Sequence, residues 1–85
     1  MRNVQFLGEA FAEVLLKYRE QRGLTQRQLA EAMESARSLI SFLENTKHMP
    51  SLQTFFAISE VLHVDPRELL NEVVVAMERM RSQKK

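Results

Sequence analysis

Residues 23–51 read GLTQRQLAEAMESARSLISFLENTKHMPS, and this stretch decides the fold. It contains two short segments in which apolar residues recur three and four positions apart, as they do on one face of a helix. A tight connection separates the two segments. Pro50 follows the second segment and bars its continuation, since proline lacks the backbone N–H that a helix interior needs. The pattern predicts two short helices joined by a turn, a helix-turn-helix arrangement.

Residues with strong positional preferences limit the first of these helices. Thr25 is a favoured N-cap residue, and Gln28 stands three positions later, where its side chain can complete a capping box. The capping box is therefore the preferred role for Gln28. The helix is expected to run to Met33. Gly23 is expected to end the preceding helix in the left-handed conformation that glycine tolerates.

The second helix is expected over residues 36–45, where steps of 100° per residue divide the side chains between two faces. The face toward the core carries Ala36, Ile40 and Leu43, and the opposite face carries Arg37, Ser38, Ser41 and Phe42. Arg37 is either a solvated surface charge or a group that contacts a partner. Its position opposite the apolar residues favours a contact.

Helical periodicity also dominates the sequence on both sides of this stretch, and no alternating pattern typical of strands persists. One helix is predicted over Val4–Gln21 and another from the cap Ser51 to about His63. Asp65-Pro66-Arg67-Glu68 predicts a fifth helix, because it combines an acidic cap, a proline in the first helical position and a glutamate at the box position. The buried candidates of the fourth helix are Leu52, Phe55, Phe56, Ala57, Ile58 and Leu62.

Length and composition indicate one all-α domain. The chain has 85 residues, of which 45% are hydrophobic, and this suits a globular fold with one small core. We place the domain at residues 1–81, with its core over 11–70 and a C-terminal helix over about 66–81. Residues 82–85 are expected to form a disordered tail.

Several classes of function are disfavoured by what the sequence lacks. There is no cysteine, and His48 and His63 are not at metal-ligand spacing, so neither a metal nor another cofactor is expected. No apolar run approaches the ~20 residues of a membrane span, and no signal peptide opens the chain, which favours a cytoplasmic protein. No arrangement of nucleophile and base points to an enzyme.

The sequence resembles a known family over Phe11 to Leu70 without a gap. The residues that carry the resemblance are Leu24-Thr25-Gln26, Leu29-Ala30, Arg37-Ser38, Ile40-Ser41, Leu43-Glu44-Asn45, Lys47, Pro50-Ser51, Val64-Asp65-Pro66 and Leu69-Leu70. They resemble the lambda-repressor and Cro type, or XRE family, of helix-turn-helix domains. The resemblance implies a five-helix lambda-repressor-like domain with the helix-turn-helix at helices 2 and 3. It also implies a DNA-binding transcriptional regulator of bacteria or phages.

The family's contacts to double-stranded DNA can be carried over by position. Base contacts are implied for Ala36, Arg37, Ser38 and Phe42, and phosphate contacts are assigned to Gln26, Arg27, Ser41 and Lys47. If Arg37 reads a base, guanine is the expected target because the guanidinium can donate to both O6 and N7. Arg19 and Glu44 match an ion pair that joins the first helix to the end of the third, and its role is structural.

Phe42 departs from the family, in which this position is commonly polar. A phenylalanine facing water would leave a large apolar surface exposed. Three interpretations stay open for it. Phe42 contacts a thymine methyl group, packs back against Leu39 or Met49, or marks a face that binds a protein.

Charge leaves a second function open. The net charge is +1, and between residues 24 and 50 three cations (Arg27, Arg37, Lys47) are matched by three anions (Glu31, Glu34, Glu44). A net charge of +1 therefore attracts DNA only weakly. A sequence-specific regulator, such as a repressor, a restriction–modification controller or an antitoxin, is the preferred interpretation. The alternative is a protein-interaction module that keeps the fold without base reading.

Three helix ends also depart from the family, which places glycine where this chain has Glu34, Thr46 and His63. Each would cost roughly 1 kcal/mol if the backbone stayed left-handed, and β-branched Thr46 more. Either these turns are remodelled, with Asn45 taking the left-handed position near Thr46, or the isolated domain is marginally stable. We expect dimerisation to restore the stability.

The fifth helix is longer than is usual in the family and supplies a candidate homodimer contact. Its predicted interface is Leu70, Val73, Val74, Met77 and Met80, spaced as in the seam of a helix pair. The alternative is that this helix folds back onto Val4, Leu7 and Phe11 of its own chain. A dimer would present two recognition helices about 34 Å apart to a near-palindromic operator.

Overall fold

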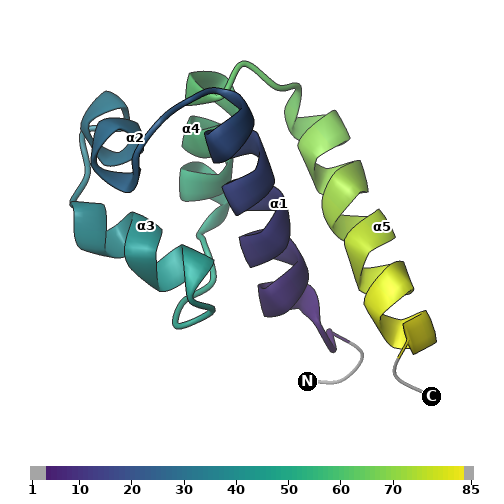
Figure 1. Ribbon diagram of the computed structural model, residues 1–85. Helices are drawn as coiled ribbons and strands as arrows, with labels where there is room; N and C mark the ends of the chain where they lie inside the picture. The colour runs from purple at the N-terminus through teal and green to yellow at the C-terminus, as the bar shows by residue number, and fades with distance from the viewer. Residues whose placement is uncertain (1–3, 84–85) are drawn as a thin grey trace.

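A computed structural model describes residues 4–83, and these residues form helices without strands (Figure 1). The helices are α1 (Leu7–Gln21), α2 (Gln26–Ala32), α3 (Arg37–Glu44), α4 (Leu52–Val61) and α5 (Pro66–Gln83). The predicted all-α, five-helix fold is confirmed. α1 and α5 lie side by side, and α2 and α3 form a corner on the other side of α1 (Figure 1).

One core holds the helices together, and each helix contributes apolar side chains to it at helical spacing. The fully buried large residues include Leu15 from α1, Leu29 from α2, Ile40 and Leu43 from α3, Ile58 from α4, and Leu69 and Val73 from α5. Ser59 is buried among them, and its hydroxyl donates to the carbonyl oxygen of Phe56 at 2.8 Å. The inward positions predicted for α3 at Ile40 and Leu43 are therefore confirmed.

Three residues predicted to be buried are exposed. Leu52 is 74% exposed and Phe56 is 52% exposed, because α4 turns only one side toward the core. Ala36 is exposed as well, since it is the N-cap of α3 and its backbone is extended (φ −78°, ψ 143°). A residue outside the first helical turn does not follow the 100° rotation from which the prediction was made.

The first four helices end in the same way. A left-handed residue follows each helix, and its backbone N–H and that of the next residue both donate to carbonyl oxygens of the helix. The left-handed residues are Gly23, Glu34, Thr46 and His63, with φ of 70°, 56°, 59° and 57°. In each turn the backbone N–H of the residue after the left-handed one donates to the carbonyl oxygen five residues earlier, as the N–H of Lys47 does to Phe42 at 2.7 Å. The turns are thus kept rather than remodelled. Asn45 has φ −97°, so the prediction that it takes over the left-handed position is wrong.

The fifth helix folds back onto its own chain. Val73 is 2% exposed, and Met77 and Met80 pack against the core, so the predicted seam is not available as one dimer interface. Apolar side chains of α1 cover that side of α5, and salt bridges join Lys17 to Glu72 at 2.8 Å and Arg79 to Glu13. Leu70 and Val74 remain exposed.

The ends of α1 and α5 differ from the predicted ones. α1 begins at Leu7 rather than Val4, after Phe6 in a left-handed conformation. α5 continues to Gln83, so the disorder predicted from residue 82 is wrong for residues 82 and 83. Residues 84 and 85 lie outside the described part of the chain. Asp65 caps α5 as predicted, accepting from the backbone N–H of Arg67 at 2.8 Å.

Candidate nucleic-acid interface

The turn between α2 and α3 is built by local hydrogen bonds. The Thr25 hydroxyl accepts from the backbone N–H of Gln28 at 3.0 Å, and the Gln28 side-chain oxygen accepts from the N–H of Thr25 at 2.9 Å. The predicted capping box is therefore present, and the Gln28 side chain is engaged in it. Left-handed Glu34 ends α2, and α3 starts three residues later. This short connection fixes the angle between the two helices.

α3 presents its polar face outward. Ile40 and Leu43 hold the helix to the core, while the sequence-predicted base-contacting residues Ala36, Arg37, Ser38 and Phe42 are all exposed. Ser41 is half-buried between them, and its hydroxyl accepts from the Asn45 side-chain amide at 3.3 Å. The structure thus brings the predicted residues together on one side of a short, firmly anchored helix.

A hydrogen-bonded network holds both ends of the helix-turn-helix against α1. The Arg19 guanidinium donates to both Glu44 carboxylate oxygens, from Nε at 2.6 Å and from Nη2 at 3.1 Å. It also donates from Nη1 to the carbonyl oxygen of Leu24 at 2.7 Å. The side chains of Arg19 and Glu44 are only 13% and 7% exposed. The ion pair expected from the resemblance is present, and the hydrogen bond to Glu44 raises the pKa of Arg19 above its usual value.

Gln26 belongs to the same network. Its side-chain amide donates to Glu44 Oε1 at 2.9 Å, so the carboxylate is hydrogen-bonded from two helices. An amide nitrogen carries two N–H donors, and this contact uses one of them. The other stays available at the start of α2. The predicted phosphate contact of Gln26 is therefore compatible with its structural role.

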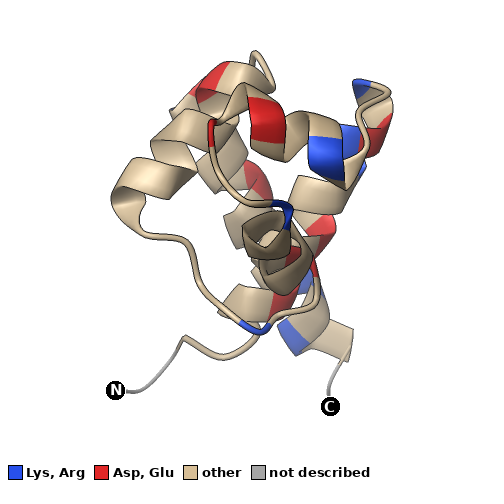
Figure 2. Ribbon diagram, turned by 90° about the vertical axis from the view of Figure 1, so that its left-hand side faces the viewer, with Lys and Arg blue, Asp and Glu red and all other residues tan. Residues whose placement is uncertain are grey.

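The charges on this side of the molecule are less balanced than their number indicates. Glu44 is neutralised by Arg19, and exposed Arg27 lies 3.8 Å from Glu31 on the same helix. Among residues 4–83, Arg37 and Lys47 form no salt bridge. Figure 2, which faces the side of α2 and α3, shows basic and acidic residues interspersed rather than gathered in one patch. Two unpaired cations therefore flank α3 without a general excess of positive charge.

His48 is a neighbour of the predicted site that the sequence analysis did not single out. Its ring lies against Phe42, with ring centroids 5.0 Å apart and an interplanar angle of 56°. Phe42 therefore packs back against the ring of His48, a neighbour that the prediction did not include. The left-handed turn at Thr46 was the available signal, because such a turn reverses the chain and returns the residues after it to the last turn of the helix.

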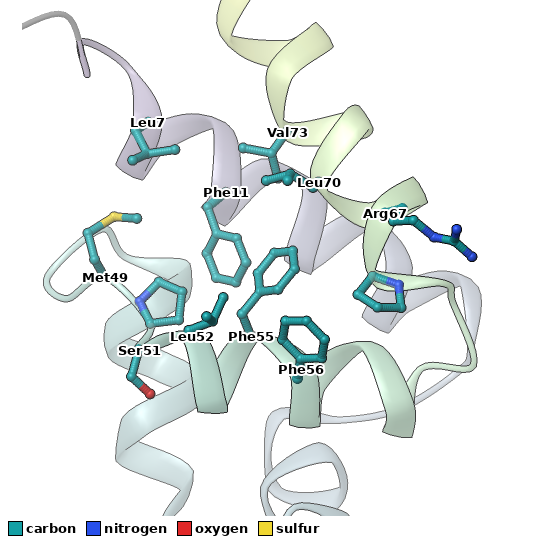
Figure 3. A pocket seen from close by; sticks show the side chains of 12 residues that line it. Leu7, Phe11, Met49, Ser51, Leu52, Phe55, Phe56, Arg67, Leu70 and Val73 are labelled. Carbon is teal, nitrogen blue, oxygen red and sulfur yellow. The ribbon is translucent and has the colours of Figure 1, made fainter.

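A second exposed feature is an apolar groove of about 750 Å³ between α1, α4, α5 and the loop that follows α3. The groove is lined by Leu7, Phe11, Met49, Pro50, Ser51, Leu52, Phe55, Phe56, Pro66, Arg67, Leu70 and Val73. Figure 3 shows Phe55 between Phe11 and Phe56, and its ring centroid is 6.1 Å from each of theirs. The only charged side chain of the lining is Arg67, which pairs with Asp65 at 2.9 Å.

Two other kinds of site are not formed by the described residues. Residues 4–83 contain no group of three or more histidine, aspartate or glutamate side chains placed to hold a metal ion. None of the described helices combines the length and the apolar composition that a membrane crossing requires. The surface around α3 and the apolar groove are therefore the features that require a functional explanation.

Comparisons with known proteins agree with the geometry of α2 and α3. A family model described as helix-turn-helix matches residues 15–69. Two solved structures of the clp gene regulator ClgR from Corynebacterium glutamicum are similar to this chain. One is 27% identical with a TM-score of 0.85, over 92% of this chain and 83% of that one. The other is 28% identical with a TM-score of 0.77, over 84% and 92%.

Among curated protein sequences, none matches this chain. The family match nevertheless covers more than half of the chain and includes the whole of α2, α3 and α4. The exposed face of α3, its buried anchors and the network around Glu44 lie within the matched residues. The chain belongs to the helix-turn-helix family of the lambda-repressor and Cro type, whose members are DNA-binding transcriptional regulators.

Proposed function

We propose that this protein is a sequence-specific transcriptional regulator that places α3 in the major groove of a near-palindromic operator as a homodimer. The observation that carries the proposal is the exposed face of α3 between two unpaired cations, Arg37 and Lys47. A short helix of this kind fits the width of the major groove. Its anchors, Ile40 and Leu43, keep the helix from shifting when its outer side chains meet base edges.

The residues take different roles in this proposal. Arg37 reads guanine through O6 and N7, a bidentate contact that discriminates by about 1–3 kcal/mol, while Ala36, Ser38 and Phe42 contact neighbouring base edges. The phosphate contacts come from Gln26, Arg27, Ser41 and Lys47. Such contacts position the protein and supply affinity, but they carry no sequence information themselves.

A revised surface is proposed for the dimer, since Val73 lies in the core of its own chain. The groove face, as we call Met49, Leu52, Phe56 and Leu70, is exposed and apolar. We assign a second copy of the chain to it. A two-fold axis brings the groups nearest to it close to their own copies, so unpaired charges there would repel. Arg67, the charged residue of the groove lining, is paired with Asp65 and so adds no unpaired charge to the groove.

The position of the groove face also suits a DNA-binding dimer. Met49 belongs to the loop that follows α3, so the groove face and the recognition helix share one edge of the molecule. Pairing two groove faces would hold both copies of α3 on the same side of the dimer. Two such helices would meet successive major grooves about 34 Å apart.

Selection of bound sequences from a random duplex pool tests the DNA-binding part of the proposal. We expect a two-fold symmetric site that contains a guanine in each half. Arg37→Ala is expected to reduce operator affinity by roughly tenfold or more per half-site without a comparable loss on random DNA. Lys47→Ala is the matched control, since loss of a phosphate contact weakens both kinds of DNA alike. No enrichment of any sequence would contradict base reading and leave a protein-interaction module as the function.

The dimer is tested by sedimentation of a matched pair of variants. Leu70 and Val75 are each 53% exposed on α5, but they point about 140° apart around the helix. Leu70→Glu adds a charge to the groove face and is expected to give a monomer. Val75→Glu adds the same charge elsewhere and is expected to stay dimeric. A wild-type chain that is monomeric at high concentration, or a Leu70→Glu variant that is still dimeric, would contradict the assignment.

A further inference from the structure

Phe42 and His48 form an aromatic pair at the edge of the exposed face of α3. Phe42 is 42% exposed, although a side chain of this size usually buries most of its surface. His48 is exposed too, and its ring lies 5.0 Å from that of Phe42 at an angle of 56°. This geometry falls within the range in which aromatic pairs attract each other. The pair therefore restrains an apolar ring that remains accessible.

The backbone fixes this arrangement. Thr46 takes the left-handed conformation, and the N–H of Lys47 donates to the carbonyl oxygen of Phe42 at 2.7 Å. The chain is thereby turned back toward the last turn of α3, and the next residue is His48. The histidine ring limits the rotation of Phe42 about its side-chain bonds, which are otherwise free to sample several rotamers on an exposed helix.

We propose that His48 is a positioning residue for DNA reading, which holds the Phe42 ring so that it meets the methyl group of a thymine. The inference rests on the proposed function, because it requires α3 to lie in the major groove. Thymine is the base selected, since its methyl group is the one apolar group that the bases present in that groove. His48 acts through Phe42 and needs no contact with a base itself.

The test replaces thymines of the selected operator by uracil, one symmetric pair at a time, which removes only the methyl group. The wild-type protein is expected to lose about fourfold in affinity per half-site at one such position. This factor corresponds to the hydrophobic free energy of burying one methyl-sized group. Phe42→Ala is expected to bind the thymine and uracil operators equally. His48→Ala is expected to reduce the thymine-to-uracil ratio toward one, while its affinity for random duplex DNA stays unchanged.

Two further variants separate positioning from folding. His48→Phe keeps an aromatic ring beside Phe42 and is expected to restore the thymine-to-uracil ratio. His63→Ala changes the other histidine, which is exposed at the end of α4, and is expected to keep that ratio. The inference is overturned if His48→Ala retains the full wild-type ratio, or if the wild-type protein binds its operator without discriminating uracil at any position. Absence of all DNA binding would refute the proposed function itself and the inference with it.

Discussion

The left-handed helix ends predict that three glycine substitutions stabilise the protein. Glu34, Thr46 and His63 are exposed and have φ near +60°, a conformation that costs an L-residue roughly 1–2 kcal/mol. Glycine has no such cost, but it adds about 0.5–1 kcal/mol of conformational entropy to the unfolded chain. Each substitution is therefore expected to raise the free energy of unfolding by about 0.5–1 kcal/mol. Thr46→Gly should give the largest gain because threonine is β-branched.

The three sites belong to separate turns, so their effects should add to about 2 kcal/mol in the triple variant. For a domain of this size, 1 kcal/mol raises Tm by roughly 4–8 °C, and the triple variant should melt about 10 °C higher. The assay is thermal and urea unfolding followed by circular dichroism. All variants are measured at one protein concentration, because a dimer makes Tm depend on concentration.

Two control substitutions test whether the gain comes from the left-handed backbone. Gly23→Ala places a side chain at φ +70°, where a Cβ would meet nothing within 4 Å, so its expected loss of about 1 kcal/mol is purely conformational. Ala32→Gly changes an exposed residue in the last position of α2, which has no left-handed strain to relieve, and should destabilise by at most about 1 kcal/mol. The reasoning is refuted if the three glycine variants melt at or below the wild-type temperature.

Two further changes probe the ion pairs of the fold. Arg19→Ala leaves Glu44 buried without its charged partner and is expected to lower the free energy of unfolding by about 3 kcal/mol. Urea denaturation measures this loss, and an unchanged midpoint would contradict it. The side-chain hydrogen bond from Arg67 lowers the pKa of Asp65 below its ordinary 3.8. The ionised Asp65 carboxylate therefore stabilises the fold above pH 3.8, and this contribution disappears as the pH falls through the lowered pKa. Asp65→Asn should therefore be less stable than wild type at pH 7, with a difference that shrinks in acid, and a constant difference across this range would count against the assignment.

The sequence predicted the parts of the fold that depend on local chemistry. The capping box of Thr25 and Gln28 and the acidic cap Asp65 involve residues only two or three positions apart, so their spacing alone determines the contact. The inward positions Ile40 and Leu43 followed from helical rotation. The Arg19–Glu44 pair spans 25 positions, and only the resemblance to a family made it predictable.

The wrong predictions concern side chains whose burial depends on which segment packs against them. Periodicity identified the apolar stripe of the fifth helix, but it could not decide whether α1 or a second copy covers Val73. Leu52 and Phe56 were assigned to the core for the same reason. The pairing of Phe42 with His48 depends on a left-handed turn at a threonine, a residue for which that conformation is unfavourable. Local preferences therefore left open whether the left-handed position would fall on Thr46 or on Asn45.

The salt dependence of binding to a random 20-base-pair duplex tests the central claim most directly, namely that the exposed side of α3 is a DNA-binding surface. We expect binding at about 50 mM salt, with an affinity that falls linearly on a log–log plot as salt rises. Lys47→Ala should make that slope shallower by about 0.9 per chain, while Val75→Glu, placed on α5, should leave it unchanged. Absence of binding at the lowest salt, or an identical slope for Lys47→Ala, would contradict the account.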